Sequence, residues 1–121
     1  MQLPLCVVDA FTRERFRGNP AAVCLPGDTV SASWMQSVAA ELNLSETAFA
    51  TRSGAGRWHL RWFTPRTEVD LCGHATLAAT LALAHWGRLQ PGTTLQLASR
   101  SGALAVGLES RWPASASLVL P

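Results

Sequence analysis

The stretch "EVDLCGHATLAATLALAHWG", residues 68–87, decides the fold of this 121-residue chain. From Gly73 onward almost every residue is small or apolar, over a length typical of a helix. The larger side chains of one face are Leu77, Leu81 and Ala84. A helix that is apolar nearly all round is buried. The sequence therefore predicts a central helix from Gly73 to about Trp86, ended by Gly87.

The segments around this helix have the pattern of short strands. "RWHLRWF" (57–63) alternates strictly: Trp58, Leu60 and Trp62 face one way and the cationic and imidazole side chains the other, typical of a half-buried antiparallel strand. "RSGAG" (52–56) is a turn signal. We expect strands at about Leu3–Phe11, Ala21–Leu25, 47–51, 57–63, Thr94–Ala98, Ala103–Glu109 and Ser117–Leu120.

"SASWMQSVAAELNLSE" (31–46) predicts a second, amphipathic helix. Ser33 with Gln36 three residues later fits a capping box, and Asn43 is a plausible end. The apolar face holds Trp34, Met35, Val38, Ala39 and Leu42, which leaves Gln36, Ser37 and Glu41 outward. The fold class is thus α+β: a mostly antiparallel sheet curled around the central buried helix, with the amphipathic helix outside.

Composition excludes several partners. The net charge is +2, and the basic cluster at Arg13, Arg15 and Arg17 includes Glu14, so a solvated segment is favoured over a phosphate or nucleic-acid site. No apolar run has membrane-spanning length, and the start "MQLPLCVVDAF" lacks the features of a signal peptide. Every basic side chain is Arg, so the chain offers no lysine for a Schiff base.

The three cysteines, Cys6, Cys24 and Cys72, are odd in number and lack CxxC spacing. A disulfide framework is not expected, and a reducing cytoplasm is the natural setting. Cys72 and the three histidines, His59, His74 and His85, do not form a recognised metal-ligand spacing, so no metal site is expected.

Cys72, Gly73 and His74 stand where the central helix begins. Free N–H groups there attract anions, a thiol there would have a lowered pKa, and the histidine can donate to a bound carboxylate. Gly73 permits close approach of a ligand, and Arg61 or Arg66 could assist. Spacing alone favours the plainer interpretation, in which the three residues serve only packing and helix capping.

Glu46, in "LNLSETAF", lies between the end of a helix and the start of a strand. A carboxylate among apolar neighbours has a raised pKa and can act as a general base and then an acid. The alternative, an exposed glutamate at a strand start, is the commoner case for such a pattern.

Four motifs in order, "GNPAAVC", "ELNLSETAF", "RWFTP" and "EVDLCGHATLAA", resemble the phenazine biosynthesis PhzF-like family of isomerases. The resemblance implies half of the diaminopimelate epimerase fold, in which each of two halves wraps a sheet around a central helix and the cleft between them holds the site. It implies Glu46 as the catalytic acid/base, His74 as its partner, and substrate contacts at Ser45, Cys72, Gly73 and Ala75. It implies no cofactor and a small carboxylate-bearing substrate.

Related epimerases use a cysteine at the corresponding helix start, but "SET" matches the isomerase branch, which favours Glu46 over Cys72. Family chains are longer and carry a second half. We therefore expect residues 1–121 to form a single N-terminal domain without the second one. Two functions stay open: an isomerase completed by a second half or by pairing in a homodimer, and a non-catalytic module for small-anion binding or protein interaction.

Overall fold

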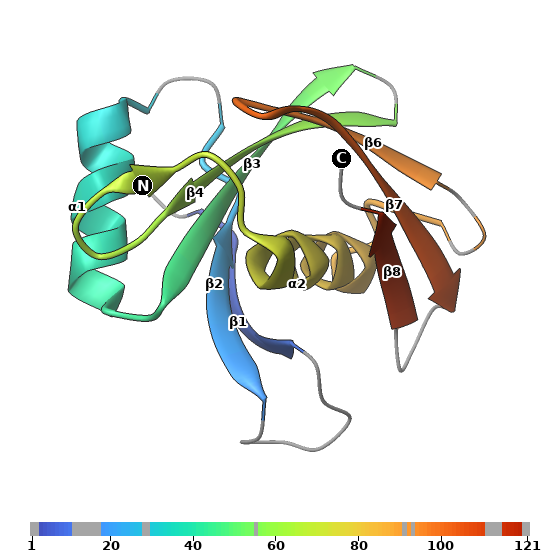
Figure 1. Ribbon diagram of the computed structural model, residues 1–121, viewed down its shortest axis with the longest axis horizontal. Coiled ribbons are helices and arrows are strands. Elements are labelled where there is room, and N and C mark those ends of the chain that lie inside the picture. Colours follow the sequence, from blue (N-terminus) through green and yellow to red (C-terminus); the bar gives the residue numbers. More distant parts are fainter. Residues whose placement is uncertain are drawn as a thin grey trace.

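The computed structural model describes residues 3–10, 18–27, 30–54, 56–90, 92, 94–110 and 115–119 (Figure 1). Two helices, α1 (Ala32–Leu42) and α2 (Gly73–His85), lie among eight strands. The strands are β1 (Leu5–Ala10), β2 (Asn19–Cys24), β3 (Glu46–Gly54), β4 (Arg57–Phe63), β5 (Glu68–Val69), β6 (Thr94–Ser99), β7 (Gly102–Ser110) and β8 (Ser115–Val119). The expected cluster at Arg13, Arg15 and Arg17 lies outside the described residues.

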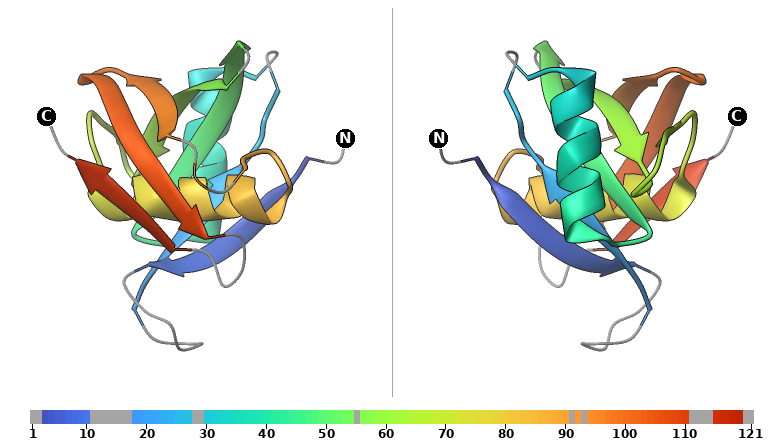
Figure 2. Two further views of the ribbon diagram at one scale, coloured as in Figure 1. Left: turned by 90° about the vertical axis from the view of Figure 1, so that its right-hand side faces the viewer. Right: turned by 90° about the vertical axis from the view of Figure 1, so that its left-hand side faces the viewer.

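All eight strands form one sheet in the order β1-β2-β3-β4-β6-β7-β8, with the short β5 paired to β4. The pairs β2–β3 and β4–β6 are parallel and the others antiparallel. The sheet curls around α2, which packs against β1 and β2 on one side and against β7 and β8 on the other (Figures 1 and 2). The α+β prediction, a mostly antiparallel sheet around a central helix, is confirmed.

Helix α2 is buried through its small residues. Its buried positions are Ala75, Thr76, Ala78, Ala79, Thr80, Ala82 and Leu83. The face of Leu77, Leu81 and Ala84, which looked dominant in the sequence, is only half-buried. Small side chains allow the curled sheet to approach the helix closely, so the alanine face and Leu83 lie deepest. The hydroxyls of Thr76 and Thr80 donate to the carbonyls of Cys72 and Thr76, which satisfies them inside the core.

Gly87 ends α2 as predicted. Its φ of 72° is the left-handed conformation that glycine adopts without strain. The N–H of Gly87 donates to the Ala84 carbonyl at 3.0 Å, and the N–H of Arg88 donates to the Leu83 carbonyl at 2.8 Å. This pair of bonds is a Schellman motif, and it satisfies carbonyls that the helix end would leave free.

The start of α1 corrects the capping-box prediction. The N-cap is Ser31, whose Oγ accepts the N–H of Trp34 at 3.1 Å, and not Ser33. Gln36 does not cap the helix or point to solvent; its side-chain amide donates to the Thr64 carbonyl at 2.9 Å. Asn43 ends the helix with φ 54°, as expected.

The two faces of the sheet hold separate cores. Trp58, Leu60 and Trp62 pack with α2, as the alternation in β4 predicted. Helix α1 lies on the other face (Figure 2, right). There its residues Met35 and Ala39 pack with Cys24, Phe49 and Phe63. Two details differ from expectation: β3 continues through the first half of the expected turn to Gly54, and β5 is not among the expected strands.

The three cysteines are free. Cys6 packs with the α2 core and Cys24 with the α1 core, so these two thiols lie on opposite faces of the sheet although their strands are paired. Within the described part of the chain, neither helix has the length and apolarity needed to cross a membrane.

Candidate active site at the start of α2

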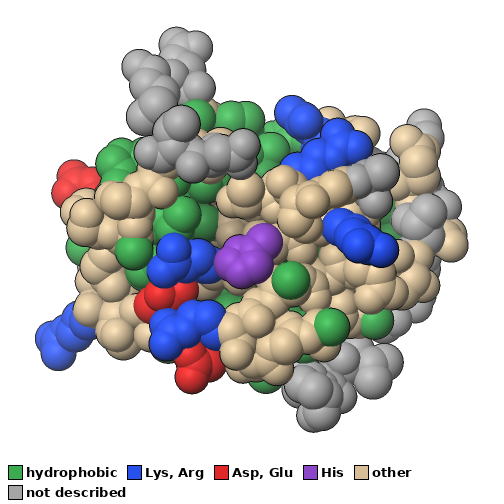
Figure 3. Space-filling model, turned by 90° about the horizontal axis from the view of Figure 1, so that it is seen from above, with side chains coloured by type: hydrophobic (Ala, Val, Ile, Leu, Met, Phe, Trp, Pro, Cys, Tyr) green, Lys and Arg blue, Asp and Glu red, His purple; other side chains and the backbone are tan. Residues whose placement is uncertain are grey.

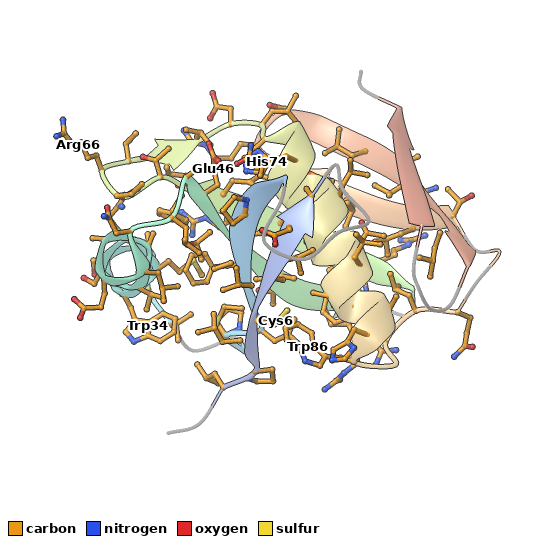
Figure 4. The ribbon with its side chains drawn as sticks, turned by 90° about the horizontal axis from the view of Figure 1, so that it is seen from below. Cys6, Trp34, Glu46, Arg66, His74 and Trp86 are labelled. Carbon is orange, nitrogen blue, oxygen red and sulfur yellow. The ribbon has the colours of Figure 1, made fainter. Side chains whose placement is uncertain are left out.

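Three chain elements begin at one place. Strands β2 and β3 run parallel, with Ala21 opposite Glu46 at the start of β3. Helix α2 packs against both strands. Glu46 shares the face of β3 with Ala48 and Ala50, which belong to the α2 core. The topology therefore turns the Glu46 side chain toward the helix start, and Figure 4 shows it beside His74.

Glu46 and His74 are in close contact. Nε2 of His74 lies 3.0 Å from Oε2 of Glu46, and the two side chains are only 11% and 19% exposed, in that order. The resemblance implied that His74 is the partner of Glu46, and the structure brings the two side chains together. A carboxylate beside an imidazole, both mostly shielded from water, can take and return a proton.

The contact does not have the directed geometry of a hydrogen bond. Oε2 of Glu46 and Nε2 of His74 are both buried and have no hydrogen-bond partner among the described residues. Buried polar atoms are nearly always satisfied, and a catalytic role is one reason for an exception. Both atoms therefore keep an unused capacity for a hydrogen bond.

Cys72 is the N-cap residue of α2, and its sulfur lies 3.2 Å from Nδ1 of His74. Burial raises the pKa of the Cys72 thiol to about 11; the negative charge of Glu46 also raises it, and the N–H groups of Ala75 and His74 lower it only in part. The prediction of a lowered pKa is wrong, because loss of water around the sulfur outweighs the helix start. The thiol is neutral at pH 7.

The substrate contacts implied by the resemblance lie around this centre. Ser45 is exposed, and its hydroxyl lies 3.4 Å from Oδ1 of Asn19. Gly73 is half-buried, whereas Ala75 is fully buried, so only its backbone could meet a ligand. Asn19 is a neighbour that no sequence pattern singled out, although the "GNPAAVC" motif contains it.

The expected arginine helpers are not at the centre. Nε and Nη2 of Arg61 donate to both carboxylate oxygens of Glu68, each at 2.7 Å, and Arg100 also contacts Glu68. Hydrogen bonding from Arg61 holds the pKa of Glu68 below its usual value. Arg66 is exposed and lies far from His74 in Figure 4. Figure 3 shows acidic and basic side chains side by side on one outer face.

Donor atoms of Glu46, Cys72 and His74 lie within 4.8 Å of one another, close enough to contact one cation. The spacing in the sequence did not indicate this group, because the fold brings Glu46 in from another element. A cysteine binds a metal as thiolate, so a cation here would have to displace the proton of the Cys72 thiol. The absence of a metal site stays a prediction.

The fold matches one half of longer proteins of known structure. A hydroxyproline epimerase from Agrobacterium vitis superposes with a TM-score of 0.64 at 12% identity, over 85% of this chain and 38% of that one, which shows the shared fold. A PhzF-family phenazine biosynthesis protein from Enterococcus faecalis superposes with a TM-score of 0.83 at 48% identity, over 88% of this chain and 40% of that one.

Comparison of sequences leads to the same family as comparison of structures. The family of phenazine biosynthesis-like proteins, PhzC-PhzF, matches residues 8–119. A protein named as an uncharacterised isomerase of Halalkalibacterium halodurans is 47% identical over 112 residues, which are 93% of this chain and 42% of the relative. The chain belongs to the PhzF-like family, and it spans about two fifths of the length of these relatives.

Proposed function

We propose that this chain carries the acid/base centre of a cofactor-independent isomerase that moves a proton on a small carboxylate-bearing metabolite. The observation that carries the proposal is the contact of Glu46 with His74, at 3.0 Å, between two buried atoms without hydrogen-bond partners in the described chain. A base that abstracts from carbon needs this kind of enclosed carboxylate, since water competes for the proton.

The roles divide by chemistry. Glu46 takes the proton from one carbon and returns it to another. His74 donates from its ring to the substrate, and the first N–H groups of α2 attract the substrate carboxylate. Cys72 does not act as the base, because a thiol with a pKa of about 11 supplies little thiolate at neutral pH.

The whole protein is also part of the proposal. Because the chain spans only about two fifths of its relatives, we propose that residues 1–121 are one domain and that a second half, or a second copy in a homodimer, closes the site. The three free cysteines fit a reducing compartment such as the cytoplasm.

A second candidate is a non-catalytic module for anion binding or protein interaction. Leu5 and Val7, on the edge strand β1, are 46% and 58% exposed, and Leu71 is 36% exposed. Apolar side chains on a sheet edge favour contact with another chain. This function needs no proton transfer, so catalysis separates the two candidates.

The test is exchange of carbon-bound hydrogen in heavy water. This chain replaces the matched segment of the Halalkalibacterium halodurans relative, and the chimera is incubated with a panel of small carboxylates while NMR follows deuterium uptake at carbon. Uptake that the Glu46→Gln chimera loses supports the isomerase. Carboxylates that bind without any uptake, in a chimera that is folded by circular dichroism, would favour the binding module.

A further inference from the structure

The two ring nitrogens of His74 face different groups. Nδ1 lies 3.2 Å from the sulfur of Cys72, and Nε2 lies 3.0 Å from a carboxylate oxygen of Glu46. A neutral imidazole carries one proton, so one nitrogen donates and the other accepts. Which nitrogen carries the proton decides whether His74 can donate into the site.

The protonation state of Cys72 determines whether Nδ1 of His74 donates or accepts. Burial keeps Cys72 as a thiol, which has one S–H donor. The acceptor side of the sulfur faces the N–H groups of Ala75 and His74 at the start of α2. The Glu46 carboxylate also lies near this thiol. Among the described side chains, the contact with hydrogen-bond geometry is the one of 3.2 Å to Nδ1 of His74, so the S–H donates to Nδ1, which then carries no proton.

The carboxylate requires the same arrangement. An unprotonated Nε2 would place its lone pair 3.0 Å from Oε2 of Glu46, and two acceptors at that distance repel. A protonated Nε2 places a positive N–H beside the negative carboxylate. Since both neighbours favour the same tautomer, the two contacts reinforce one another.

We propose that Cys72 is a positioning residue, whose S–H donates to Nδ1 of His74 and holds His74 in the neutral tautomer with its proton on Nε2. In terms of the proposed function, on which this role rests, the tautomer presents an N–H to the substrate beside the Glu46 base. The N–H is not used up by Glu46, because the contact between them is not a directed hydrogen bond.

The direct test is nitrogen NMR of this chain with ¹⁵N-labelled histidine. His59, His74 and His85 give three sets of signals, and the set that His74→Gln removes belongs to His74. We expect a pyrrole-type signal for Nε2 and a pyridine-type signal for Nδ1, the latter shifted by its accepted hydrogen bond. A pyrrole-type Nδ1 would overturn the proposal, because His74 would then donate to the sulfur.

Variants of Cys72 isolate its role. Cys72→Ala should move the Nδ1 signal to the position of a nitrogen without a hydrogen bond, and Cys72→Ser, which keeps a donor, should restore the shift. Cys6→Ala is the matched control, since Cys6 lies near Trp86 and far from His74 (Figure 4). Signals unchanged in Cys72→Ala would refute the role of the thiol. If Cys72→Ala does not fold, the wild-type and Cys72→Ser spectra still decide the tautomer.

The readouts separate this proposal from the proposed function. The tautomer is measured without substrate, so it stands or fails independently of catalysis. In the deuterium-uptake assay, Cys72→Ala should lower the rate by about ten-fold, the scale of one lost neutral hydrogen bond, with rescue by Cys72→Ser. An Nε2–H tautomer in a chimera without uptake would retain the inference about Cys72 and refute the isomerase.

Discussion

Glu46 and His74 lie on different elements, at the first residue of β3 and in the first turn of α2, yet their side chains meet at 3.0 Å. Parallel pairing of β2 with β3 brings both strand starts to one end of α2. The contact is therefore a consequence of topology, and the proposed acid/base centre depends on it.

Leu83 should contribute more to the free energy of unfolding than Leu81. Leu83 is fully buried, whereas Leu81 is half-buried. Leu83→Ala should lower the free energy of unfolding by about 2–5 kcal/mol, because it removes buried methyl groups and leaves a cavity. Urea denaturation of both variants measures the difference. A larger loss for Leu81→Ala would contradict the packing of α2 described here.

Stability should fall between about pH 9 and 11. Burial raises the pKa of both Cys24 and Cys72 to about 11, from the ordinary thiol value of 9.0. A raised pKa in the folded state means that stability is intact below the unfolded value and is lost as pH rises through the folded one. The chain has no Lys or Tyr to titrate in this range.

Urea denaturation at stepped pH measures this effect. The double variant Cys24→Ala and Cys72→Ala should show a much flatter profile, although its stability at pH 7 is lower. A wild-type profile that stays flat to pH 11 would mean that the thiols are better solvated than the structure indicates.

Small carboxylates should bind at the start of α2. The first N–H groups of a helix attract anions, and His74 adds a donor. Titration with a series of small carboxylates should move the amide signals of Gly73, His74 and Ala75, and the effect should weaken with salt. A response confined to the surface around Arg61 and Arg100 would place the anion site elsewhere.

The edge strand β1 should promote self-association. Leu5 and Val7 are exposed on a strand whose outer edge pairs with no other strand of the described sheet. Val7→Lys places a charge there, which natural sheets use to prevent edge pairing. Sedimentation should show association in the wild type and less in the variant. A wild-type monomer at high concentration would contradict this prediction.

Much of this fold can be predicted from local pattern. An apolar circumference identified α2 as the central helix, and strict alternation identified β4. The parallel pairs were missed, although each joins strands separated by a helix, α1 for β2–β3 and α2 for β4–β6. A helix of this kind provides the crossover that parallel strands need.

The wrong predictions arise where the tertiary structure overrides a local rule. The helix start lowers the pKa of a nearby thiol, but the sheet encloses Cys72 and desolvation dominates. Ser31 and Ser33 both suit an N-cap. The extended backbone conformation of Ser31 selects it, and the local pattern of residue types does not reveal that conformation. The pairing of Glu46 with His74 came from the family resemblance, since residues so distant in sequence carry no spacing signal.

The rate of deuterium uptake in Glu46→Gln chimeras tests the central claim most directly. Glu46→Gln keeps the shape of the side chain and removes the proton acceptor, so uptake should fall at least ~100-fold, the lower end for a general base. Glu41→Gln, at an exposed position on α1, is the matched control and should leave the rate unchanged. Cys72→Ala should lower the rate of uptake far less than Glu46→Gln does. If Cys72→Ala abolished uptake while Glu46→Gln retained it, the thiol would be the base and the account of Glu46 would be wrong.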